Sequence, residues 1–557
     1  MSGLQLSGEQ SSAAFSDEAH LLVIAPPGCG KTEVLAHRAA HEIALLKTNQ
    51  RVLALTFTKR ARSNLEERLR TVLGHTRARR TVIVRNFHGF ASQVVTAHAG
   101  TIGLNPSTLV LPKSSTMRKS MERASGGGSA MYEAERILSA VKRRPLSDTE
   151  VLAAIKNLGS GQAIDLAYRV EFDRQESGQL HYDDLLRHAQ RLLRVPAVAH
   201  LYQTHFGAVL VDEFQDLSMQ QLDLAMRSST SRRTFAGDPL QGIYSWAGAD
   251  PSRVEAVIRR VTEEPIRLRE SYRSSPKVLM TTNSLSEQIE AGAMLVSAQP
   301  DRWADGGCTA KLVFEGRADE ASAIATTAAS ILQHDPTASI GVISRAAWRR
   351  GEIDTEFGRT TLPVRRWDLA IDDPTIVALI QTTIAALPRG ATVADARSAV
   401  LAAVDPADID TRELVEGAFD TLDRSDATTA RAAIRALRVS DPNQAVGPGV
   451  HLLNAHTGKG QQFDWVFVIG LEEDHIPGKR NNAGAALAEE QRVLLVMLSR
   501  ARHGLILTRT RTAQGWRGPT PVTENRWWST LQADFSVLAG VQAHLRKLSK
   551  DGSNGQE

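Results

Sequence analysis

The stretch Leu-Leu-Val-Ile-Ala-Pro-Pro-Gly-Cys-Gly-Lys-Thr occupies residues 21–32 and decides the fold class. Its four leading apolar residues predict a buried strand, and apolar residues at helical spacing follow at Val34, Leu35 and Ala39. A strand, a glycine-containing loop and a helix form the context that a phosphate-binding P-loop requires. The loop matches G-x-x-x-x-G-K-[ST] except that Ala25 holds the first position. We therefore predict an α/β protein that binds a nucleotide.

The residues of this loop suit the binding of a nucleoside triphosphate. Gly28 and Gly30 allow backbone N–H groups to turn toward a phosphate, and the following helix adds its positive dipole end. Lys31 is placed to reach the β- and γ-phosphates, and the Thr32 hydroxyl is placed to hold Mg²⁺. Cys29 lies in the same loop, where a redox role and a tolerated small residue are both possible, and we favour the second.

The composition indicates a multidomain globular protein. The chain has 557 residues, of which 42% are hydrophobic and 23% charged, and single cores stop growing near 250–300 residues. Two cysteines argue against a disulfide framework and favour a reducing cytoplasm. We find neither a transmembrane run, a signal peptide nor zinc-ligand spacing. A net charge of +4 permits nucleic-acid binding without establishing it.

Two further apolar strands lead into residues that suit ATP hydrolysis. The strand predicted at 208–211 runs directly into Asp212 and Glu213. Asp212 would hold Mg²⁺ near the γ-phosphate, and Glu213 would orient and deprotonate the attacking water. The strand predicted at 234–237 leads into a polar loop, where Gln241 could sense the γ-phosphate or the water.

Other residues are candidates for the nucleotide on weaker grounds. Gln10 precedes the P-loop strand, where an adenine contact and a solvated cap are the two interpretations. Farther along the chain, Arg273 is a candidate arginine finger and Tyr272 a candidate for stacking on adenine.

Aromatic and hydroxyl side chains at two strand ends are candidates for nucleic-acid contacts. The strand that begins at residue 51 ends in Thr56, Phe57 and Thr58. Hydroxyls can bond phosphates and an aromatic ring can stack on a base, but packing of the phenylalanine at the strand end is an equally good interpretation. Tyr244 and Trp246 form a second aromatic pair that could stack on bases or belong to the core.

A basic region interrupts the first α/β pattern and has the character of an insertion. It contains a Gly/Ser run at 125–129 that predicts a flexible loop. A solvated helical surface and a phosphate-binding face are equally good interpretations of its basic residues. These residues are Lys113, Arg118, Lys119, Lys142, Arg143 and Arg144.

Taken in order, these segments resemble the UvrD/Rep/PcrA family of superfamily 1 DNA helicases. The matching segments are a Gln motif at Gln10, APPGCGKT, ALTFTKRA, NFHGF, VDEFQD, AGDPLQGIYSW, ESYRS, AHTGKGQQFD and LSRA. The resemblance covers residues 6–275 and 450–508 well. It implies two RecA-like P-loop domains with parallel sheets, plus helical inserted subdomains.

The resemblance also implies domain boundaries. The first RecA-like ATP-binding domain would comprise 1–90 and 180–275, with a helical insertion subdomain at 91–179. The second would comprise 276–367 and 441–535, with a small helical insertion at 368–440 and a C-terminal tail at 536–557. In full-length relatives the domain corresponding to 368–440 is much larger and touches duplex DNA.

Site roles follow from the same resemblance. The residues that would act in catalysis are Lys31, Asp212, Glu213, Gln241, Arg273 and Arg500. Those that would hold ATP are Gln10, Ala25, Pro26, Pro27, Gly28, Cys29, Gly30, Lys31, Thr32, Tyr272 and Gln462, with Mg²⁺ on Thr32 and Asp212. Those that would contact single-stranded DNA are Thr56, Phe57, Thr58, His88, Tyr244, Trp246 and His456.

The sequence departs from the family pattern at several positions. Ala247 replaces an arginine, Glu33 a basic residue, and Ser271 an asparagine, while Gln461 and Gln462 replace Leu-Glu. The missing arginine removes one charge network near DNA, and the glutamine pair changes the expected ribose contact.

The predicted function is an ATP-dependent DNA helicase or translocase of the cytoplasm. It would move 3′ to 5′ on single strands and unwind duplex at single-strand/double-strand junctions, in DNA repair, recombination or antiviral defence. The alternative is an ATP-binding regulatory subunit with little unwinding of its own, which gates a partner nuclease, for example in a Gabija-type anti-phage system. A DNA-repair protein is a further expected partner, and we expect no association with a membrane.

Overall fold

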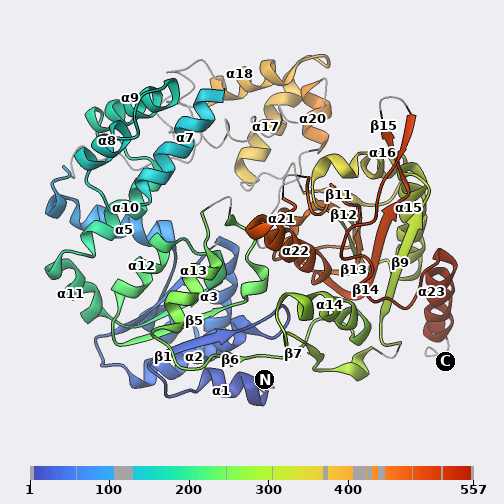
Figure 1. Cartoon of the computed structure of the whole chain (residues 1–557), viewed down its shortest axis with the longest axis horizontal. Coiled ribbons are helices and arrows are strands. Elements are labelled where there is room, and N and C mark those ends of the chain that lie inside the picture. Colours follow the sequence, from blue (N-terminus) through green and yellow to red (C-terminus); the bar gives the residue numbers. More distant parts are fainter. Residues whose placement is uncertain are drawn as a thin grey trace. The chain divides into compact units, whose positions relative to one another are not determined.

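The computed structural model describes residues 6–57, 59–105, 129–245, 248–303, 305–367, 374–404, 429–436, 446–479, 481–515 and 518–553, with the single residues 415, 419 and 422. The chain divides into two compact units (Figure 1). The first comprises Met1–Ala25, Lys31–Pro239 and Tyr244–Leu268. The second comprises Pro26–Gly30, Leu240–Ile243 and Arg269–Glu557.

A six-stranded parallel sheet forms the centre of the first unit, in the order β3-β2-β4-β5-β1-β6. Its strands are β1 (His20–Ile24), β2 (Arg51–Thr56), β3 (Val82–Asn86), β4 (Phe206–Asp212), β5 (Arg232–Gly237) and β6 (Ile266–Arg267). Every residue of β4 is buried. Parallel strands covered on both faces are continuous apolar runs, which is why the sequence predicts them. The α/β class and the strands before the P-loop and before Asp212 are thereby confirmed.

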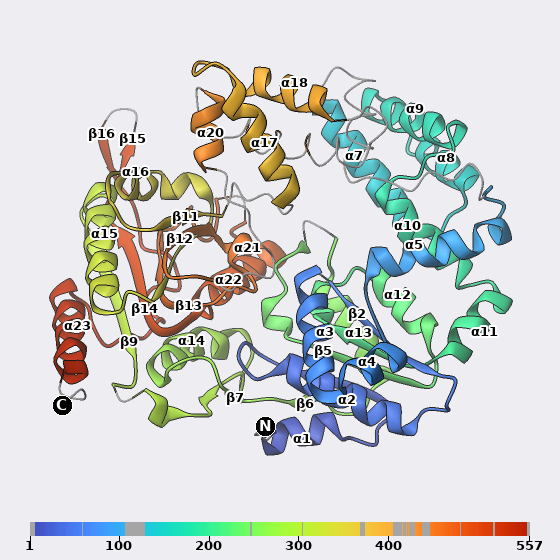
Figure 2. The same cartoon turned by 180° about the vertical axis from the view of Figure 1, so that it is seen from behind.

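Helices cover both faces of this sheet. They are α1 (Gly8–Ala14), α2 (Lys31–Leu45), α3 (Lys59–Leu73), α4 (His75–Thr81), α5 (Phe87–His98), α10 (Tyr182–Leu192), α11 (Pro196–His205), α12 (Met219–Ser228) and α13 (Pro251–Arg259). Figures 1 and 2 view the unit from opposite sides, with α12 and α13 on one face and α2 to α4 on the other. Helix α5 crosses the predicted boundary at residue 90, because Phe90 and Val94 belong to one core with the strands.

Three helices of the insertion extend the first unit. They are α7 (Ser129–Lys142), α8 (Asp148–Lys156) and α9 (Gln162–Glu176), and they share a small core that includes Leu138, Val151 and Val170. The finer domain boundaries that the resemblance implies stay predictions.

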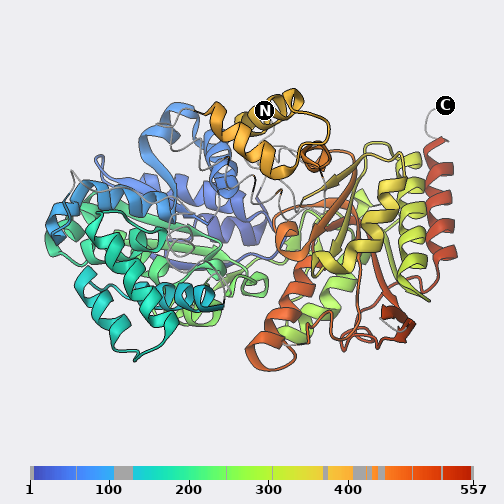
Figure 3. The ribbon, with the colours of Figure 1, turned by 90° about the horizontal axis from the view of Figure 1, so that it is seen from above.

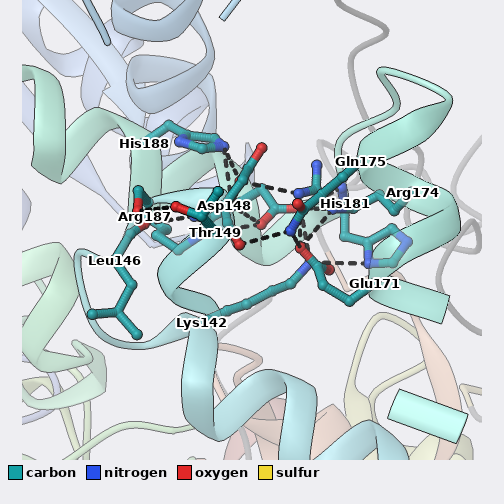
Figure 4. A network of polar contacts seen from close by, with 12 residues as sticks. Lys142, Leu146, Asp148, Thr149, Glu171, Arg174, Gln175, His181, Arg187 and His188 are labelled. Atoms are coloured by element: carbon teal, nitrogen blue, oxygen red, sulfur yellow. Dashed lines mark hydrogen bonds and ion pairs between the residues drawn. The ribbon is translucent and has the colours of Figure 1, made fainter. Parts of the chain in front are cut away.

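A buried network of charged side chains joins α7, α8, α9 and α10 (Figure 4). The carboxylate of Asp184 accepts hydrogen bonds from Lys142 Nζ at 2.9 Å and from Arg187 Nε at 3.1 Å. Glu171 pairs with Lys142 at 2.6 Å and with Arg174 at 2.7 Å. Four of these five side chains are fully buried and Arg174 is nearly so, and buried charges persist only where they are paired. The network therefore fixes how the four helices pack.

The position of Lys142 corrects one expectation from the sequence. Its side chain is neither solvated nor available to phosphates, because it is fully buried against Glu171, Asp184 and His181. Arg143 and Arg144 are exposed, so both interpretations stay open for them. The other three basic residues, Lys113, Arg118 and Lys119, lie outside the described residues.

We expect acid to weaken this network. Burial, together with neighbouring cations, lowers the pKa of His181 and of His188 to about 3. Each histidine is therefore neutral in the folded protein but becomes protonated in the unfolded chain below about pH 6.5. The unfolded chain then binds more protons, so this stability is complete above pH 6.5 and is lost as the pH falls. Lowering the pH from 7 to 5 should cost roughly 2 kcal/mol for each histidine.

Hydrogen exchange of amides in α9 and α10, corrected for intrinsic rates, measures this effect at the two pH values. The variant His188→Gln removes one of the two titrating groups and should roughly halve the pH dependence. An opening free energy that does not change between pH 7 and 5 would contradict the assignment of two neutral buried histidines.

A second six-stranded parallel sheet forms the centre of the second unit, in the order β11-β12-β10-β13-β14-β9. Its strands are β9 (Cys308–Phe314), β10 (Ser339–Ser344), β11 (Val364–Arg366), β12 (Gly449–Asn454), β13 (Phe463–Val468) and β14 (Ala501–Thr510). Shorter pairs are β7 (Glu270–Ser271) with β8 (Val296–Ser297), and β15 (Thr512–Gly515) with β16 (Gly518–Pro521).

Two hydrophobic cores lie on the two faces of the second sheet. One contains residues of α15 (Arg317–His334), α16 (Gly351–Arg359) and α23 (Leu538–Ser553), and the other contains residues of α14 (Pro276–Ile289) and α22 (Gly484–Leu498). Figure 3 shows this sheet between the two groups of helices. The remaining helices are α17 (Pro374–Ala386), α18 (Val393–Ala403), α20 (Ala430–Ala436) and α21 (Ala455–Gly458).

The segment 536–557, for which the sequence predicts only a tail, contains helix α23. Val541 is fully buried and Leu545 nearly so, both in the core on the α15 face. Within the described ranges, the helices are too short or too polar to cross a bilayer.

Candidate functional site

The predicted site residues of the first unit lie along one edge of its sheet. All six strands are parallel, so the segments that follow them emerge at the same carboxyl edge. Among the predicted DNA contacts, Thr56 ends β2, His88 follows β3 and Tyr244 follows β5, whereas Lys31 and Thr32 follow β1 and Asp212 ends β4. The strand order β3-β2-β4-β5-β1 therefore puts the candidates of both kinds along the same edge of the sheet.

Lys31 and the two carboxylates converge at this edge. The Lys31 Nζ atom lies 2.6 Å from Asp212 Oδ1 and 2.5 Å from Glu213 Oε1. Burial alone would lower the pKa of Lys31, but the charges of Asp212 and Glu213 raise it above its ordinary value. The ammonium is therefore charged, and the two carboxylates share one cation.

Glu213 is held in an unusual backbone conformation. Its φ of 56° and ψ of 50° place it in the left-handed region, which costs a non-glycine residue roughly 1–3 kcal/mol. The side chain of Gln215 fixes this turn: its Nε2 donates to Glu213 Oε2 at 2.7 Å, and its Oε1 accepts from Asp238 N at 3.0 Å. A Cβ on Gly237 would lie 2.2 Å from Gln215 Oε1 and 3.0 Å from Phe214 N, so a side chain there would displace Gln215 from its two hydrogen bonds.

The P-loop residues 26–30 pack against the segment that contains Arg273. Gly28 has a φ of 87°, and a Cβ on it would lie 2.6 Å from both Arg273 Cβ and Ser271 Oγ. The Gly28 carbonyl accepts a hydrogen bond from Tyr272 N at 2.9 Å. The hydroxyl of Ser271, which replaces the family's asparagine, accepts from Arg273 N at 3.4 Å. Cys29 is 1% exposed, and such burial favours a small packing residue over a redox group.

Gln241 and Arg500 are in direct contact within the second unit. Arg500 Nη2 donates to Gln241 Oε1 at 3.2 Å, and Arg500 is only 2% exposed. Lys459 Nζ donates to the backbone carbonyl of Gln241 at 2.8 Å. The guanidinium of Arg500 is held further by Ser499 Oγ and by the carbonyl of Val496.

Three predicted or divergent residues near the nucleotide motifs have defined partners. Gln10 completes a capping box at the start of α1, where its Oε1 accepts from Ser7 N at 3.0 Å. Glu33 forms an ion pair with Arg68 of α3, which accounts for an acidic residue at this position. Gln462 Oε1 accepts from Arg502 Nη2 at 3.1 Å.

Aromatic pairs lie at the strand ends of the first unit. Phe57 and Tyr244 stack with ring centroids 5.6 Å apart and planes 21° apart. His88 and Tyr182 stack more closely, at 3.9 Å and 20°. Burial lowers the pKa of His88 to about 4, so its ring is neutral at pH 7. Thr56 is fully buried.

Two predicted DNA contacts, Thr58 and Trp246, lie outside the described residues, as does Ala247. In the second unit, His456 follows β12 in the short helix α21, where Asn454 Oδ1 caps His456 N at 3.1 Å. Arg500 and Gln462 precede strands β14 and β13, so they lie at the opposite edge of this sheet from His456.

Two residues of the site are not among the sequence predictions. Gln215 lies inside the carboxylate motif, but its sequence position does not reveal that it joins Glu213 to the end of β5. Tyr182 begins a helix whose other residues are largely buried, and its 41% exposure is the feature that stands out. Tyr182 and His88 are 94 residues apart in the sequence, and only the fold brings their rings together.

Two family models match the chain. The model described as the UvrD/REP helicase N-terminal domain matches residues 6–262, and the model described as the UvrD-like helicase C-terminal domain matches residues 419–512. The first match includes Lys31, Asp212 and Glu213, and the second includes His456 and Arg500.

Curated relatives carry helicase names. The ATP-dependent DNA helicase PcrA of Staphylococcus aureus is 28% identical over 289 residues, covering 50% of this chain and 39% of the relative. PcrA of Leuconostoc citreum is 28% identical over 292 residues, with the same two shares. DNA helicase II of Salmonella typhimurium is 28% identical over 296 residues, covering 51% of this chain and 40% of the relative. The matches thus span well under half the length of these relatives.

Proposed function

The chain belongs to the UvrD/REP helicase family, and we propose that it is a DNA-dependent ATPase that moves 3′ to 5′ along single-stranded DNA and unwinds duplex. The observation that carries this proposal is the convergence of Lys31, Asp212 and Glu213 at the carboxyl edge of the first sheet. A phosphate-binding lysine, a metal-binding aspartate and a general base are the set that ATP hydrolysis requires.

The residues fit a magnesium ion with the nucleotide. Thr32 and Asp212 offer a hydroxyl and a carboxylate, which are the hard oxygen donors that Mg²⁺ prefers. Asp212 Oδ1 is buried and already directed at a cation, the Lys31 ammonium. Mg²⁺ bound there would neutralise charge on the phosphates, and Lys31 would turn to the β- and γ-phosphates.

Glu213 is the proposed general base for the attacking water. Its left-handed backbone and the hydrogen bond from Gln215 fix the carboxylate in one direction, which is the preorganisation a base needs. Arg500 and Arg273 are the proposed arginine fingers, which stabilise the charge that develops on the γ-phosphate. Gln241, whose Oε1 accepts a hydrogen bond from Arg500, is the proposed sensor of the γ-phosphate.

The proposed DNA contacts act through stacking rather than charge. His88 is neutral at pH 7, so its ring with Tyr182 presents an aromatic surface to bases. Phe57 and Tyr244 present a second such surface at the end of β2. Stacking is tolerant of sequence, which suits a motor that moves along any strand.

The variant Tyr244→Ala should weaken binding of single-stranded DNA. Loss of one stacking ring costs about 1–3 kcal/mol, so the dissociation constant should rise about 5- to 150-fold. Fluorescence anisotropy with a labelled oligonucleotide at fixed salt measures the change. Tyr244→Phe keeps the ring and is the matched control, which should bind within about twofold of the unchanged protein. Equal affinity of the alanine variant would place DNA elsewhere.

The direction of movement is tested with tailed duplexes. In the presence of ATP and Mg²⁺, the chain should displace the strand of a duplex with a 3′ single-stranded tail and leave a 5′-tailed duplex intact. The variant Lys31→Ala is the control for ATP dependence. Displacement of the 5′-tailed duplex would overturn the direction, and binding of both duplexes without displacement of either would overturn unwinding.

A further inference from the structure

We propose that Asp305, His503 and His544 form a binding site for a divalent transition-metal ion of the zinc class, which fastens helix α23 to the sheet of the second unit. Asp305 Oδ2 lies 2.7 Å from His503 Nε2 and 3.0 Å from His544 Nε2. The three ligand atoms all lie within 4.8 Å of one another. Two imidazoles and one carboxylate are donors that zinc uses widely, with water in a fourth position.

The geometry is close to what a four-coordinate ion needs. Zinc bonds of 2.0–2.2 Å in a tetrahedron place neighbouring ligand atoms about 3.4 Å apart. Asp305 Oδ2 would therefore move away from each histidine nitrogen by less than about 1 Å to admit the ion. In that form Nε2 of each imidazole gives up the hydrogen that it directs at Asp305 Oδ2, and the ring carries its proton on Nδ1, so metal binding changes the tautomer of both histidines.

The surrounding residues orient the ligands. Asp305 Oδ1 accepts a hydrogen bond from Gly307 N at 3.0 Å, which directs Oδ2 at the two histidines. Gly307 has a φ of 92°, and a Cβ there would lie 2.7 Å from the His503 carbonyl oxygen, so glycine is required in this turn. The His503 ring contacts Trp303 and Trp465, with ring centroids 5.4 Å and 5.2 Å apart. Such outer contacts are typical of metal sites.

A second cluster of carboxylates and histidine, in the first unit, differs from the proposed metal site because it already contains a cation. Glu171, His181 and Asp184 also lie close enough to share an ion. There, however, Lys142 Nζ lies 2.6 Å from Glu171 and 2.9 Å from Asp184, so the chain supplies its own cation. Beside Asp305, the backbone N–H of Lys277 donates to the Gly306 carbonyl, but the Lys277 ammonium pairs with Asp534 at 3.2 Å.

The proposed ion would join three separate elements. Asp305 precedes β9, His503 lies in β14, and His544 lies in α23. Helix α23 packs on β9 and α15 through Val541 and Leu545, at the end of the sheet where β9 is the last strand (Figure 1). Opening of α23 would have to break the metal bond to His544, so metal binding should slow that opening.

Metal titration of the full chain without nucleotide tests the proposal. After removal of metals with a chelator, cobalt(II) is added and its visible absorption is recorded, followed by competition with zinc. We expect one tight equivalent per chain. His544→Gln and Asp305→Asn should each lower the affinity by more than the 10- to 100-fold that outer-sphere changes cost. His334→Gln, which changes an exposed histidine at the end of α15, is the matched control and should bind as the unchanged chain does.

Hydrogen exchange provides a second readout that does not depend on absorption. At free zinc 100 times its dissociation constant, exchange of the amides around Val541 and Leu545 should slow about 100-fold. The same addition should leave α23 unchanged in His544→Gln. Cobalt and zinc affinities that are equal in the site variants and the control, or exchange in α23 that ignores zinc, would overturn the proposal.

Discussion

Replacing Glu213 with glutamine should lower the turnover number for DNA-stimulated ATP hydrolysis by about 10²- to 10⁴-fold. Glutamine keeps the size and the hydrogen-bonding oxygen of the side chain but cannot accept the proton of the attacking water. Lys31, Thr32 and Asp212 are unchanged, so Mg·ATP should still bind with an affinity within roughly threefold of the original. Steady-state hydrolysis and equilibrium binding of a fluorescent nucleotide measure the two quantities separately.

Glu263→Gln is the matched control for this variant. Glu263 is exposed, follows α13 and is not one of the proposed site residues. The turnover number of Glu263→Gln should therefore match that of the unchanged protein. A turnover number for Glu213→Gln within tenfold of the original would assign the general base to another residue. Loss of nucleotide binding in the same variant would mean that Glu213 acts in holding the nucleotide rather than in the chemical step.

Replacing Asp184 with alanine should destabilise the α7–α10 region by about 3–5 kcal/mol. The change leaves Lys142 and Arg187 buried without the carboxylate that pairs with both. Solvating them requires the helices to part, so the loss should exceed that of an ordinary surface substitution. Urea unfolding followed by protection of the α9 amides locates the loss in this region.

Asp165→Ala is the control for the network prediction. Asp165 lies in the first turn of α9 and is exposed, so its removal should change stability by less than about 0.5 kcal/mol. If Asp184→Ala were as stable as this control, water would have to reach the buried cations. Such a result would also remove the basis of the acid sensitivity expected from His181 and His188.

The sequence is most informative where the chain is buried on both faces. The strands β1, β2, β4 and β5 are apolar runs, and each ends in a polar motif. Pattern and position together therefore predict both the fold class and the first half of the site. The short strands β6 and β11 have two and three residues, too few for any periodicity.

Long-range pairing is the part that the sequence does not reveal. From the sequence alone, the basic character of Lys142 indicates a surface residue. Its partners Glu171 and Asp184 lie on other helices, so the sequence does not show that they pair with it in the interior. Asp305 and His544 are 239 positions apart, so the chain shows no metal-ligand spacing although the side chains meet. Only the three-dimensional fold creates such clusters, since each ligand lies on a different element.

DNA dependence of ATP hydrolysis decides whether the chain is a DNA-driven motor. The purified chain is assayed with Mg·ATP in the presence and absence of a single-stranded oligonucleotide, at one salt concentration, with Lys31→Ala as the blank. We expect a strong rise in turnover when DNA is added and none in the blank. Tight nucleotide binding with the same low turnover with and without DNA would contradict an autonomous motor, and would favour an ATP-binding subunit that gates a partner.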